Sequence, residues 1–239
     1  MQLKILKKQK IVGKKVLVRV DLNVPIINSK IADDTRIKAI LPTLKYLIKN
    51  KAKVILISHL GDPEGKKDKK YSLEPVAKYL KVKFLDDCLG KNNEAIIAKM
   101  KPGEIVLLEN LRFYAGEEEN SDDFAKKLAN LADIYINEAF SVSHRNHASL
   151  VAITKFLPSY AGFLMEGEVE ALDKILKNPS HPLIAIIGGA KISTKIKVIK
   201  NLLKKVDYLL VGGALANNFF KAQGNEVGKS LIEEKMLEE

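Results

Sequence analysis

The sequence of 239 residues holds a single cysteine, Cys88, no tryptophan and only 6% aromatic residues. One cysteine excludes a disulfide within the chain and a zinc site built from cysteines. No apolar run approaches the roughly 18 residues that a membrane-spanning helix needs. The basic start, MQLKILKKQK, lacks the apolar core of a secretory signal. We therefore expect a protein of the reducing cytoplasm without a membrane partner.

Arginine is also scarce. Only four of the 40 basic residues are arginine, and they are Arg19, Arg36, Arg112 and Arg145. Guanidinium groups bind carboxylates and phosphates through two parallel hydrogen bonds, which lysine does not reproduce, so these four positions are informative. The net charge of +11 comes with few aromatic residues and no aromatic-plus-basic RNA-binding pattern. We interpret it as a solvated lysine surface and expect no nucleic-acid partner.

Short apolar runs alternate with stretches of helical periodicity along the chain. The predicted strands cover residues 16–22, 53–58, 82–85, 105–109, 133–137, 183–189 and 208–213. The predicted helices cover residues 34–50, 72–81, 92–100, 121–132, 163–178, 193–205 and 214–222. This alternation predicts an α/β fold with a Rossmann-like parallel sheet and helices on both of its faces. Ligands of such sheets bind at the carboxyl ends of the strands.

The domain prediction depends on the run LIAIIGG at residues 183–189. A continuously apolar run is typical of a parallel strand that is buried on both faces. The roughly 60 residues from this run to the end are too few to bury such a sheet by themselves. We predict a first domain over residues 1–160, a linking helix over 161–179, and an incomplete second α/β domain over 180–239. The chain is accordingly interpreted as truncated.

Polar side chains line one face of the first predicted strand. Arg19, Asp21 and Asn23 are spaced two residues apart and so share a face just before Pro25. Polar groups in a sheet cost free energy unless each has a partner. They indicate either a site for a small polar ligand or a structural salt bridge between Arg19 and Asp21, and the strand alone leaves both readings open.

Four basic side chains follow the carboxyl ends of predicted strands. They are Arg36, His59, Arg112 and Arg145, and His147 lies two residues beyond the last of them. Arginines that converge with a histidine near carboxylate and amide groups suit a small phosphorylated carboxylic acid. No pair of histidines or of histidine and carboxylate has the spacing of a known metal-ligand pattern, so no metal site is predicted.

Two glycine-rich turns follow the last two predicted strands. The string GGAKISTKI (188–196) joins a strand to a helix and carries Gly189, Lys191 and Lys195. Glycines let backbone N–H groups approach an anion at a helix N-terminus, and two lysines four apart are expected to share a helix face. Gly212 and Gly213 repeat the pattern after the next strand. Together the two turns indicate a nucleotide pocket.

Seven strings of the sequence strongly resemble the phosphoglycerate kinase family, in that family's order. They are VRVDLNVP (18–25), SHLGDP (58–63), LLENLRF (107–113), NEAFSVSHRNHAS (137–149), AGFLMEGE (161–168), GGAKISTKI (188–196) and GGALANNF (212–219). Members of this family have two Rossmann-like domains joined by a helical hinge. The resemblance covers the N-terminal domain, the hinge helix and the start of the C-terminal domain.

The resemblance implies a cytoplasmic, monomeric transferase of glycolysis. The implied reaction is ATP + 3-phosphoglycerate ⇌ ADP + 1,3-bisphosphoglycerate, with Mg²⁺ accompanying ATP or ADP and held by a protein ligand from a later part of such proteins. In phosphoryl transfer the protein mainly positions the substrates and stabilises charge, and no general base is needed because the attacking carboxylate is already ionised. As a truncated chain, the 239 residues are predicted to lack kinase activity. The alternative is therefore a module that binds 3-phosphoglycerate without turning it over.

The resemblance also implies roles for individual residues. The substrate-binding residues it implies are Asp21, Asn23, Arg36, His59, Arg112, Arg145 and His147. The nucleotide-binding residues it implies are Gly189, Lys191, Lys195, Gly212 and Gly213. Arg36 and Lys191 are the catalytic candidates, because both are expected to neutralise the phosphoryl group during transfer.

Two positions depart from the family pattern. Asp62 stands where the family usually has an arginine, which puts an acid where a phosphate-binding base is expected. Gly167 stands in the predicted hinge helix where a longer residue is common. A glycine there costs roughly 0.5–1 kcal/mol of helix stability and is expected to loosen the helix.

Overall fold

The computed structural model describes residues 3–177 and 179–239. Contacts divide the chain into two units, Met1–Val169 and Glu170–Glu239, and helix α6 (Phe163–Lys177) crosses the boundary. The predicted division at residues 160 and 180, with a hinge helix between, stays a prediction. Within the described ranges, none of the helices has both the length and the apolar character needed to cross a bilayer.

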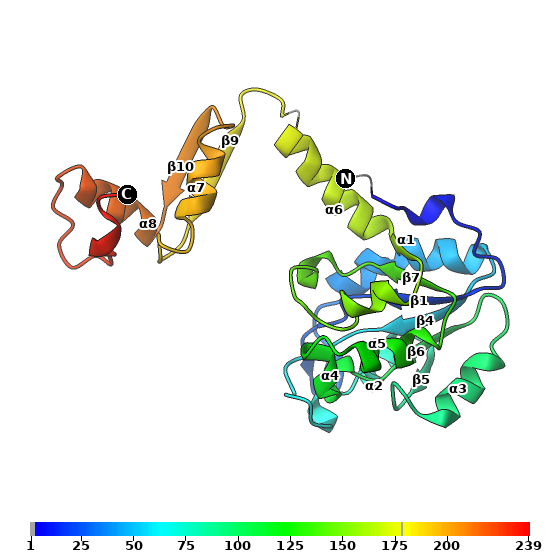
Figure 1. Cartoon of the computed structure of the whole chain (residues 1–239). Coiled ribbons are helices and arrows are strands. Elements are labelled where there is room, and N and C mark those ends of the chain that lie inside the picture. Colours follow the sequence, from blue (N-terminus) through cyan, green and yellow to red (C-terminus); the bar gives the residue numbers. More distant parts are fainter. Residues whose placement is uncertain (1–2, 178) are drawn as a thin grey trace. The chain divides into compact units, whose positions relative to one another are not determined.

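The first unit is built on a sheet of six parallel strands (Figure 1). Their order is β5 (Lys83–Leu85), β6 (Ile105–Leu108), β4 (Lys53–Ile57), β1 (Lys15–Arg19), β7 (Ile134–Asn137) and β8 (Ser159–Ala161). Arg19 at the end of β1 pairs in register with Ile57 of β4 and Asn137 of β7. Because these three strands end level, the segments that follow them meet at one edge of the sheet.

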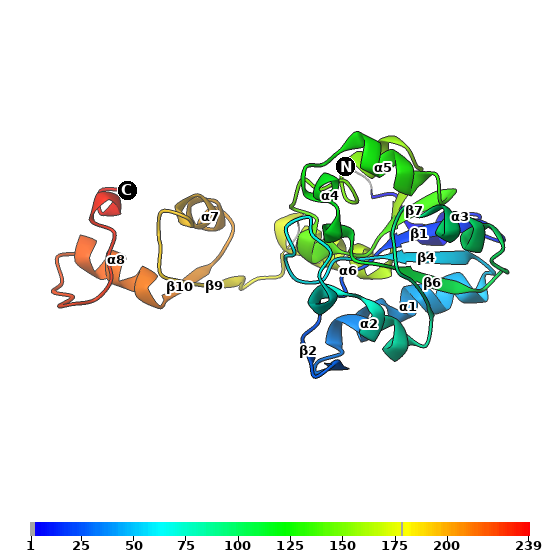
Figure 2. The ribbon, with the colours of Figure 1, turned by 90° about the horizontal axis from the view of Figure 1, so that it is seen from below.

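Helices cover both faces of this sheet, as the sequence predicts (Figure 2). Those on one face are α1 (Thr35–Lys49) and α2 (Glu74–Leu80), and those on the other are α3 (Lys91–Ala98), α4 (Ala115–Glu118) and α5 (Asp122–Ala129). Each face has its own cluster of buried apolar side chains. The predicted α/β fold with a parallel sheet is therefore confirmed.

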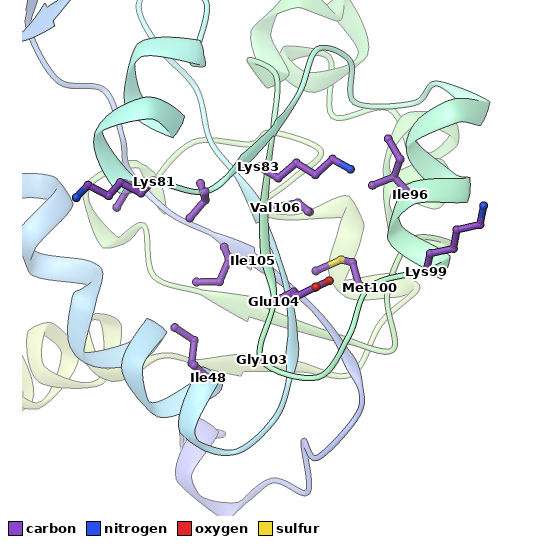
Figure 3. A pocket seen from close by; sticks show the side chains of 12 residues that line it. Ile48, Lys81, Lys83, Ile96, Lys99, Met100, Gly103, Glu104, Ile105 and Val106 are labelled. Carbon is purple, nitrogen blue, oxygen red and sulfur yellow. The ribbon is translucent and has the colours of Figure 1, made fainter.

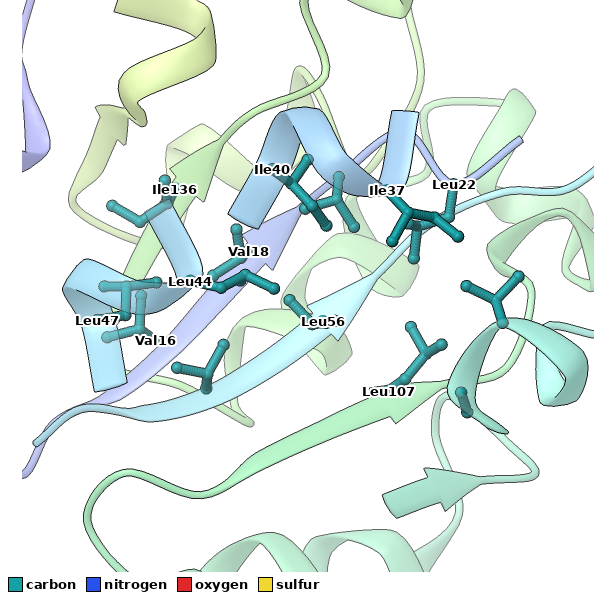
Figure 4. Packing of buried hydrophobic residues seen from close by; sticks show 14 of the residues in the cluster. Val16, Val18, Leu22, Ile37, Ile40, Leu44, Leu47, Leu56, Leu107 and Ile136 are labelled. Carbon is teal, nitrogen blue, oxygen red and sulfur yellow. The ribbon is translucent and has the colours of Figure 1, made fainter. Parts of the chain in front are cut away.

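The alternation of the first strand decides which side chain enters which cluster. Val16 and Val18 lie in the cluster beneath α1, whereas Leu17 lies in the cluster on the opposite face. Helix α1 presents a buried stripe at helical spacing toward the same valines, consisting of Ile37, Ile40, Leu44 and Leu47 (Figure 4). Burying each such side chain stabilises the fold by roughly 1.5–3 kcal/mol.

Short elements escaped the sequence prediction. They are the antiparallel pair β2 (Ile26–Ile27) and β3 (Lys30–Ile31), strand β8, helix α4, and the 3₁₀ turns Leu6–Lys8, Lys69–Tyr71, Leu111–Phe113, Phe140–Val142, Ala152–Lys155 and Glu234–Met236. Segments of two to four residues are too short to show a period. The β2–β3 turn places Asn28 and Ser29 at positive φ, as tight hairpin turns require.

The second unit contains a parallel pair of strands, β9 (Ile184–Gly188) and β10 (Tyr208–Gly212), with α7 (Ile196–Leu202) and α8 (Ala214–Ala222). The prediction that residues 183–189 are buried on both faces is wrong for this structure. Ile184 and Ile186 are 53% and 79% exposed. In the part of the chain that the structure describes, β9 pairs with β10 alone, and the small core around Ile199 and Leu215 covers one face of the pair.

Candidate functional site

Arg19 ends β1 with its guanidinium fully inside the first unit. Its Nε donates to Ser149 Oγ at 2.9 Å, and Ser149 Oγ donates to Glu117 Oε1 at 2.6 Å. Through Ser149, the buried guanidinium of Arg19 is therefore connected to the carboxylate of Glu117. The structural salt bridge between Arg19 and Asp21, one of the two readings of the strand, is not formed, since the described residues show no Arg19–Asp21 pair within 4.0 Å.

Arg19 also determines the state of His59, which follows β4. Nη2 of Arg19 lies 3.1 Å from Nδ1 of His59. A guanidinium only donates hydrogen bonds, so Nδ1 accepts and the imidazole carries its proton on Nε2. Burial, followed by the positive charge of Arg19, lowers the pKa of His59 to about 2. At neutral pH His59 therefore offers an uncharged N–H donor.

Asp21 and Arg36 form an ion pair at the carboxyl end of β1. Asp21 also accepts from the Ser141 hydroxyl at 2.5 Å and from the Asn23 backbone N–H at 3.0 Å. Burial would raise the pKa of Asp21, but these donors outweigh it and hold the pKa below its usual value of 3.8. Asp21 is thus an anion at neutral pH. The Arg36 side chain, in the first turn of α1, remains 48% exposed.

Gly61 joins the segments that follow β1 and β6. Its backbone N–H donates to Asn23 Oδ1 at 2.9 Å, and its carbonyl accepts from Arg112 Nη1 at 2.7 Å. The residue has a φ of +60°, and a Cβ there would overlap the ring of Tyr71. Only glycine satisfies both conditions, so the turn holds Asn23 and Arg112 in one hydrogen-bonded arrangement.

Arg112 is buried beside two acids. Glu118 Oε1 lies 3.2 Å from its Nε, and Asp62 Oδ1 lies 3.6 Å from its Nη1. The contact with Glu118 lacks hydrogen-bond geometry, and Nε of Arg112 is a buried nitrogen without a hydrogen-bond partner among the described residues. Asp62 is 70% exposed, so it pairs with the guanidinium from the solvent side. Arg112 is therefore a buried cation at this edge whose charge is shared between Glu118 and Asp62.

Arg145 and His147 lie in the segment after β7. Arg145 is exposed, and in residues 3–177 and 179–239 no carboxylate comes within 4.0 Å of its guanidinium. Burial is the main cause that lowers the pKa of His147, and the positive charges of Arg112 and Arg145 lower it further. Arg145 also contributes to the lowered pKa of His59. The positive charge of Arg145 therefore lowers the pKa values of both His59 and His147.

The structure thus brings most of the predicted substrate residues together. Asp21 and Arg36 are in direct contact. Asn23 and Arg112 are linked through hydrogen bonds to the backbone of Gly61. Those related to them by electrostatic effects are His59, Arg145 and His147. Their roles in binding stay predictions. The sequence missed Ser141 and Ser149, because a lone serine in a loop shows no pattern until the fold supplies its partner.

In the second unit, the two glycine turns pack against each other. Leu215 N donates to Gly189 O at 2.9 Å, and a Cβ on Gly213 would stand 3.2 Å from that same oxygen. Gly189 and Gly213 have φ values of +145° and +64°, which favour glycine. A Cβ on Gly189 would meet Lys195 Cε at 3.0 Å, whereas one on Gly212 would meet open space.

The predicted helix face shared by Lys191 and Lys195 is not present. Helix α7 begins at Ile196, with Lys195 as its N-cap residue, so both lysines precede the helix. The preceding turn is held by Glu233, which accepts from the backbone and the hydroxyl of Ser193 at 2.9 and 2.8 Å. Lys191 is exposed in this turn.

A hollow of about 630 Å³ lies at the amino ends of the strands and contains none of the predicted site residues (Figure 3). Its floor is apolar, with Ile105 and Met100, and it carries Lys81 and Lys99. These two lysines are the C-cap residues of α2 and α3. Cations at helix C-termini stabilise the helix dipole, which explains them without a ligand.

The residues that the structure describes contain no group of three or more histidine, cysteine or acidic side chains placed to hold a metal ion. The Mg²⁺ that the resemblance implies therefore has no fitting set of ligands among them. We derive no step of the chemistry from a metal held by this chain.

The fold and the site define a class of protein. A parallel α/β sheet carries Arg36 against an ionised Asp21 at its carboxyl edge, with Arg112 at the same edge, and a second unit carries paired glycine turns, as in proteins that bind phosphorylated ligands. A family model described as "Phosphoglycerate kinase" matches residues 6–239. The chain belongs to the phosphoglycerate kinase family.

Individual relatives support this assignment. The phosphoglycerate kinase of Geotalea uraniireducens is 54% identical over 233 residues, which cover 94% of this chain and 58% of that protein. The one from Moorella thermoacetica is 52% identical, covering 94% and 59%. The solved structure of phosphoglycerate kinase from Coxiella burnetii matches with a TM-score of 0.89 and 43% identity, covering 99% of this chain and 61% of that one. The chain therefore spans about three-fifths of the length of these proteins.

Proposed function

We propose that this chain provides the 3-phosphoglycerate side of the reaction ATP + 3-phosphoglycerate ⇌ ADP + 1,3-bisphosphoglycerate, in glycolysis and in the cytoplasm, as a monomer. The observation that carries the proposal is the arrangement at the carboxyl edge of the first sheet. There a half-exposed Arg36 is paired with an ionised Asp21, and Arg112 is joined through the backbone of Gly61 to Asn23. These groups offer hydrogen bonds and positive charge to a small anion.

The charges orient the substrate. Ionised Asp21 repels a carboxylate or phosphate and accepts a hydrogen bond from a hydroxyl, so we assign the substrate hydroxyl to Asp21 and Asn23. The carboxylate then lies toward Arg36. The phosphate lies toward the basic residues of the same edge, which are His59, Arg112, Arg145 and His147. Neutral His59 contributes its Nε2–H as a donor.

Phosphoryl transfer needs positioning and neutralisation of charge more than covalent participation by the protein. The attacking carboxylate of 3-phosphoglycerate is already ionised at neutral pH, so no general base is required. We propose that Arg36 and Lys191 neutralise the phosphoryl group during transfer. Lys195 and the turns at Gly189 and Gly212–Gly213 bind the nucleotide, which enters as its Mg²⁺ complex.

A second candidate is favoured by the length of the chain. The 239 residues span 58–61% of the relatives named above. The alternative proposal is that they bind 3-phosphoglycerate without kinase activity, because in-line transfer requires both substrates to be held at once.

Calorimetric titration of the 239-residue chain with 3-phosphoglycerate tests both proposals. We expect binding, and we expect Arg36→Met to weaken it by about 10- to 100-fold, which corresponds to losing one charge-assisted pair. Lys38→Met is the matched control, because Lys38 lies on the same helix, is exposed and pairs only with Asp34 among the described residues. Absence of binding to the wild-type chain would overturn the proposed function.

A coupled assay for ADP formation separates the two candidates. No turnover by the 239-residue chain, together with binding of 3-phosphoglycerate, supports the binding module. Turnover would reject the module and support the complete reaction in this chain.

A further inference from the structure

Glu138 has a fully buried carboxylate just after β7. Its Oε2 accepts from the backbone N–H groups of Leu164 and Met165 at 2.9 and 3.2 Å. Its Oε1 accepts from the hydroxyl of Thr43, and Thr43 Oγ1 accepts from Phe163 N at 3.1 Å. The first three N–H groups of α6 thus all end on Glu138 and Thr43.

This is a helix cap supplied by distant parts of the chain. The first N–H groups of a helix have no partner inside it, and a negative charge there is favoured by the helix dipole. The contacts join residues that are 26 positions apart in the case of Glu138 and Leu164, and 120 apart in the case of Thr43 and Phe163. A Cβ on Gly162 would overlap Glu138, so the chain reaches the cap only with glycine at that position.

The segment that carries Glu138 reaches the candidate ligand site three residues later. Ser141 donates to Asp21 at 2.5 Å, and Asp21 pairs with Arg36. Arg36 and Thr43 lie seven residues apart on α1, which places them on the same face of that helix.

The contacts therefore close a ring. It runs from Glu138 to Thr43, along α1 to Arg36, through Asp21 to Ser141, and back along the chain to Glu138. Every non-covalent link is a hydrogen bond or ion pair, and Glu138 and Thr43 are buried. Restraining one member of a closed ring restrains the others, since each link fixes the geometry of the next.

We propose that Glu138 is a positioning residue that couples the first turn of α6 to the Asp21–Arg36 pair. An anion that orders Arg36 also orders α1 and the Ser141 segment, which lowers the frequency with which the first turn of α6 opens. Loosening the pair has the opposite effect. The identity of the anion rests on the proposed function, whereas the coupling between the two places does not.

Hydrogen exchange of the peptide that covers residues 163–165 tests the coupling without ligand. We expect Ser141→Ala, whose hydroxyl contacts Asp21, to raise exchange in that peptide by about fivefold, in the range of a lost cap. Thr43→Val removes the capping hydroxyl and raises exchange as well, while Thr43→Ser restores protection. Ser121→Ala is the matched control, because Ser121 caps α5 and should raise exchange in α5 alone. Unchanged α6 exchange in Ser141→Ala would overturn the proposal.

A second arm adds 3-phosphoglycerate. In the wild-type chain the ligand is expected to slow exchange of residues 163–165. Glu138→Gln keeps an oxygen that accepts from Leu164 and Met165 but loses the charge and the acceptor for Thr43. We expect it to bind the ligand while losing at least half of that slowing. Full slowing in Glu138→Gln would overturn the coupling role of Glu138. If the wild-type chain fails to bind the ligand, the proposed function fails, and the ligand-free arm still decides the coupling.

Discussion

Nη2 of Arg19 lies 3.1 Å from Nδ1 of His59, in the interior of the first unit. Because a guanidinium can only donate hydrogen bonds, Nδ1 of His59 must accept in this contact, and the imidazole is therefore neutral. The contact connects the end of β1 to the end of β4, 40 residues apart. His59 is thereby a neutral hydrogen-bond donor whose ring is held in one orientation.

The first prediction concerns the titration of His59. Its pKa is lowered from 6.5 to about 2, so its ring resonances in NMR spectra should not shift between pH 8 and pH 5. The unfolded chain takes up this proton near pH 6.5 and the folded chain does not until about pH 2. The stability from this group is therefore present above pH 6.5 and is lost as the pH falls below it, by at most about 1.4 kcal/mol per pH unit.

Urea unfolding at pH 7 and pH 5 measures this loss. His59→Asn retains a short side chain with an acceptor near the Nδ1 position and should remove the part of the pH dependence that His59 contributes, leaving the part that comes from His147, whose pKa is also lowered. His144→Asn is the control, since His144 is exposed in the same region. A His59 resonance that titrates near pH 6.5 contradicts the neutral assignment.

The second prediction concerns the acid that stands beside Arg112. Asp62 Oδ1 lies 3.6 Å from Arg112 Nη1 from the solvent side, so it competes with an anionic ligand for the guanidinium. Asp62→Asn should strengthen binding of 3-phosphoglycerate by about threefold to fivefold, as expected for an exposed ion pair worth up to about 1 kcal/mol. The gain should shrink at high salt. Glu64→Gln, an exposed acid two residues away, should leave affinity unchanged. Equal affinities for Asp62→Asn and wild type would argue against the competition.

The third prediction compares two glycines near the start of α6. A Cβ on Gly162 would overlap Glu138, so Gly162→Ala should lower the free energy of unfolding by about 1–3 kcal/mol. Gly167 has open space around its Cβ position inside the helix, so Gly167→Ala should raise that free energy by about 0.5–1 kcal/mol. Chemical denaturation of both variants gives the answer. Equal effects would mean that the space around Gly162 is not what requires glycine.

The fourth prediction concerns acid stability. The pKa of Asp21 is below 3.8 in the folded chain, so its contribution to stability is present above that pH and is lost as the pH falls through the folded value. Asp21→Asn should be less stable than wild type by about 1–3 kcal/mol at pH 7, because it loses hydrogen bonds to a charged group. The gap should close toward pH 3. Denaturation curves at several pH values measure it, and a gap that stays constant with pH would show that ionisation of Asp21 is not its source.

Much of the first unit follows from the period of its sequence. Alternation in residues 16–22 divides Val16 and Val18 from Leu17, and the structure places them on opposite faces of the sheet. All seven predicted strands and all seven predicted helices correspond to elements of the structure. The apolar run at residues 183–189 correctly predicts a strand but not its exposure, because apolar composition does not show which neighbouring elements cover a strand.

The sequence by itself determined the α/β fold, the edge at which polar residues gather, and the family, because period and motif are local properties of the chain. Only the tertiary structure decided how those residues are paired. It pairs Arg19 with Ser149, 130 residues away, keeps His59 uncharged well below its usual pKa, and makes Glu138 the cap of α6. Burial and long-range hydrogen bonds set these states, and both depend on neighbours that the order of residues does not reveal.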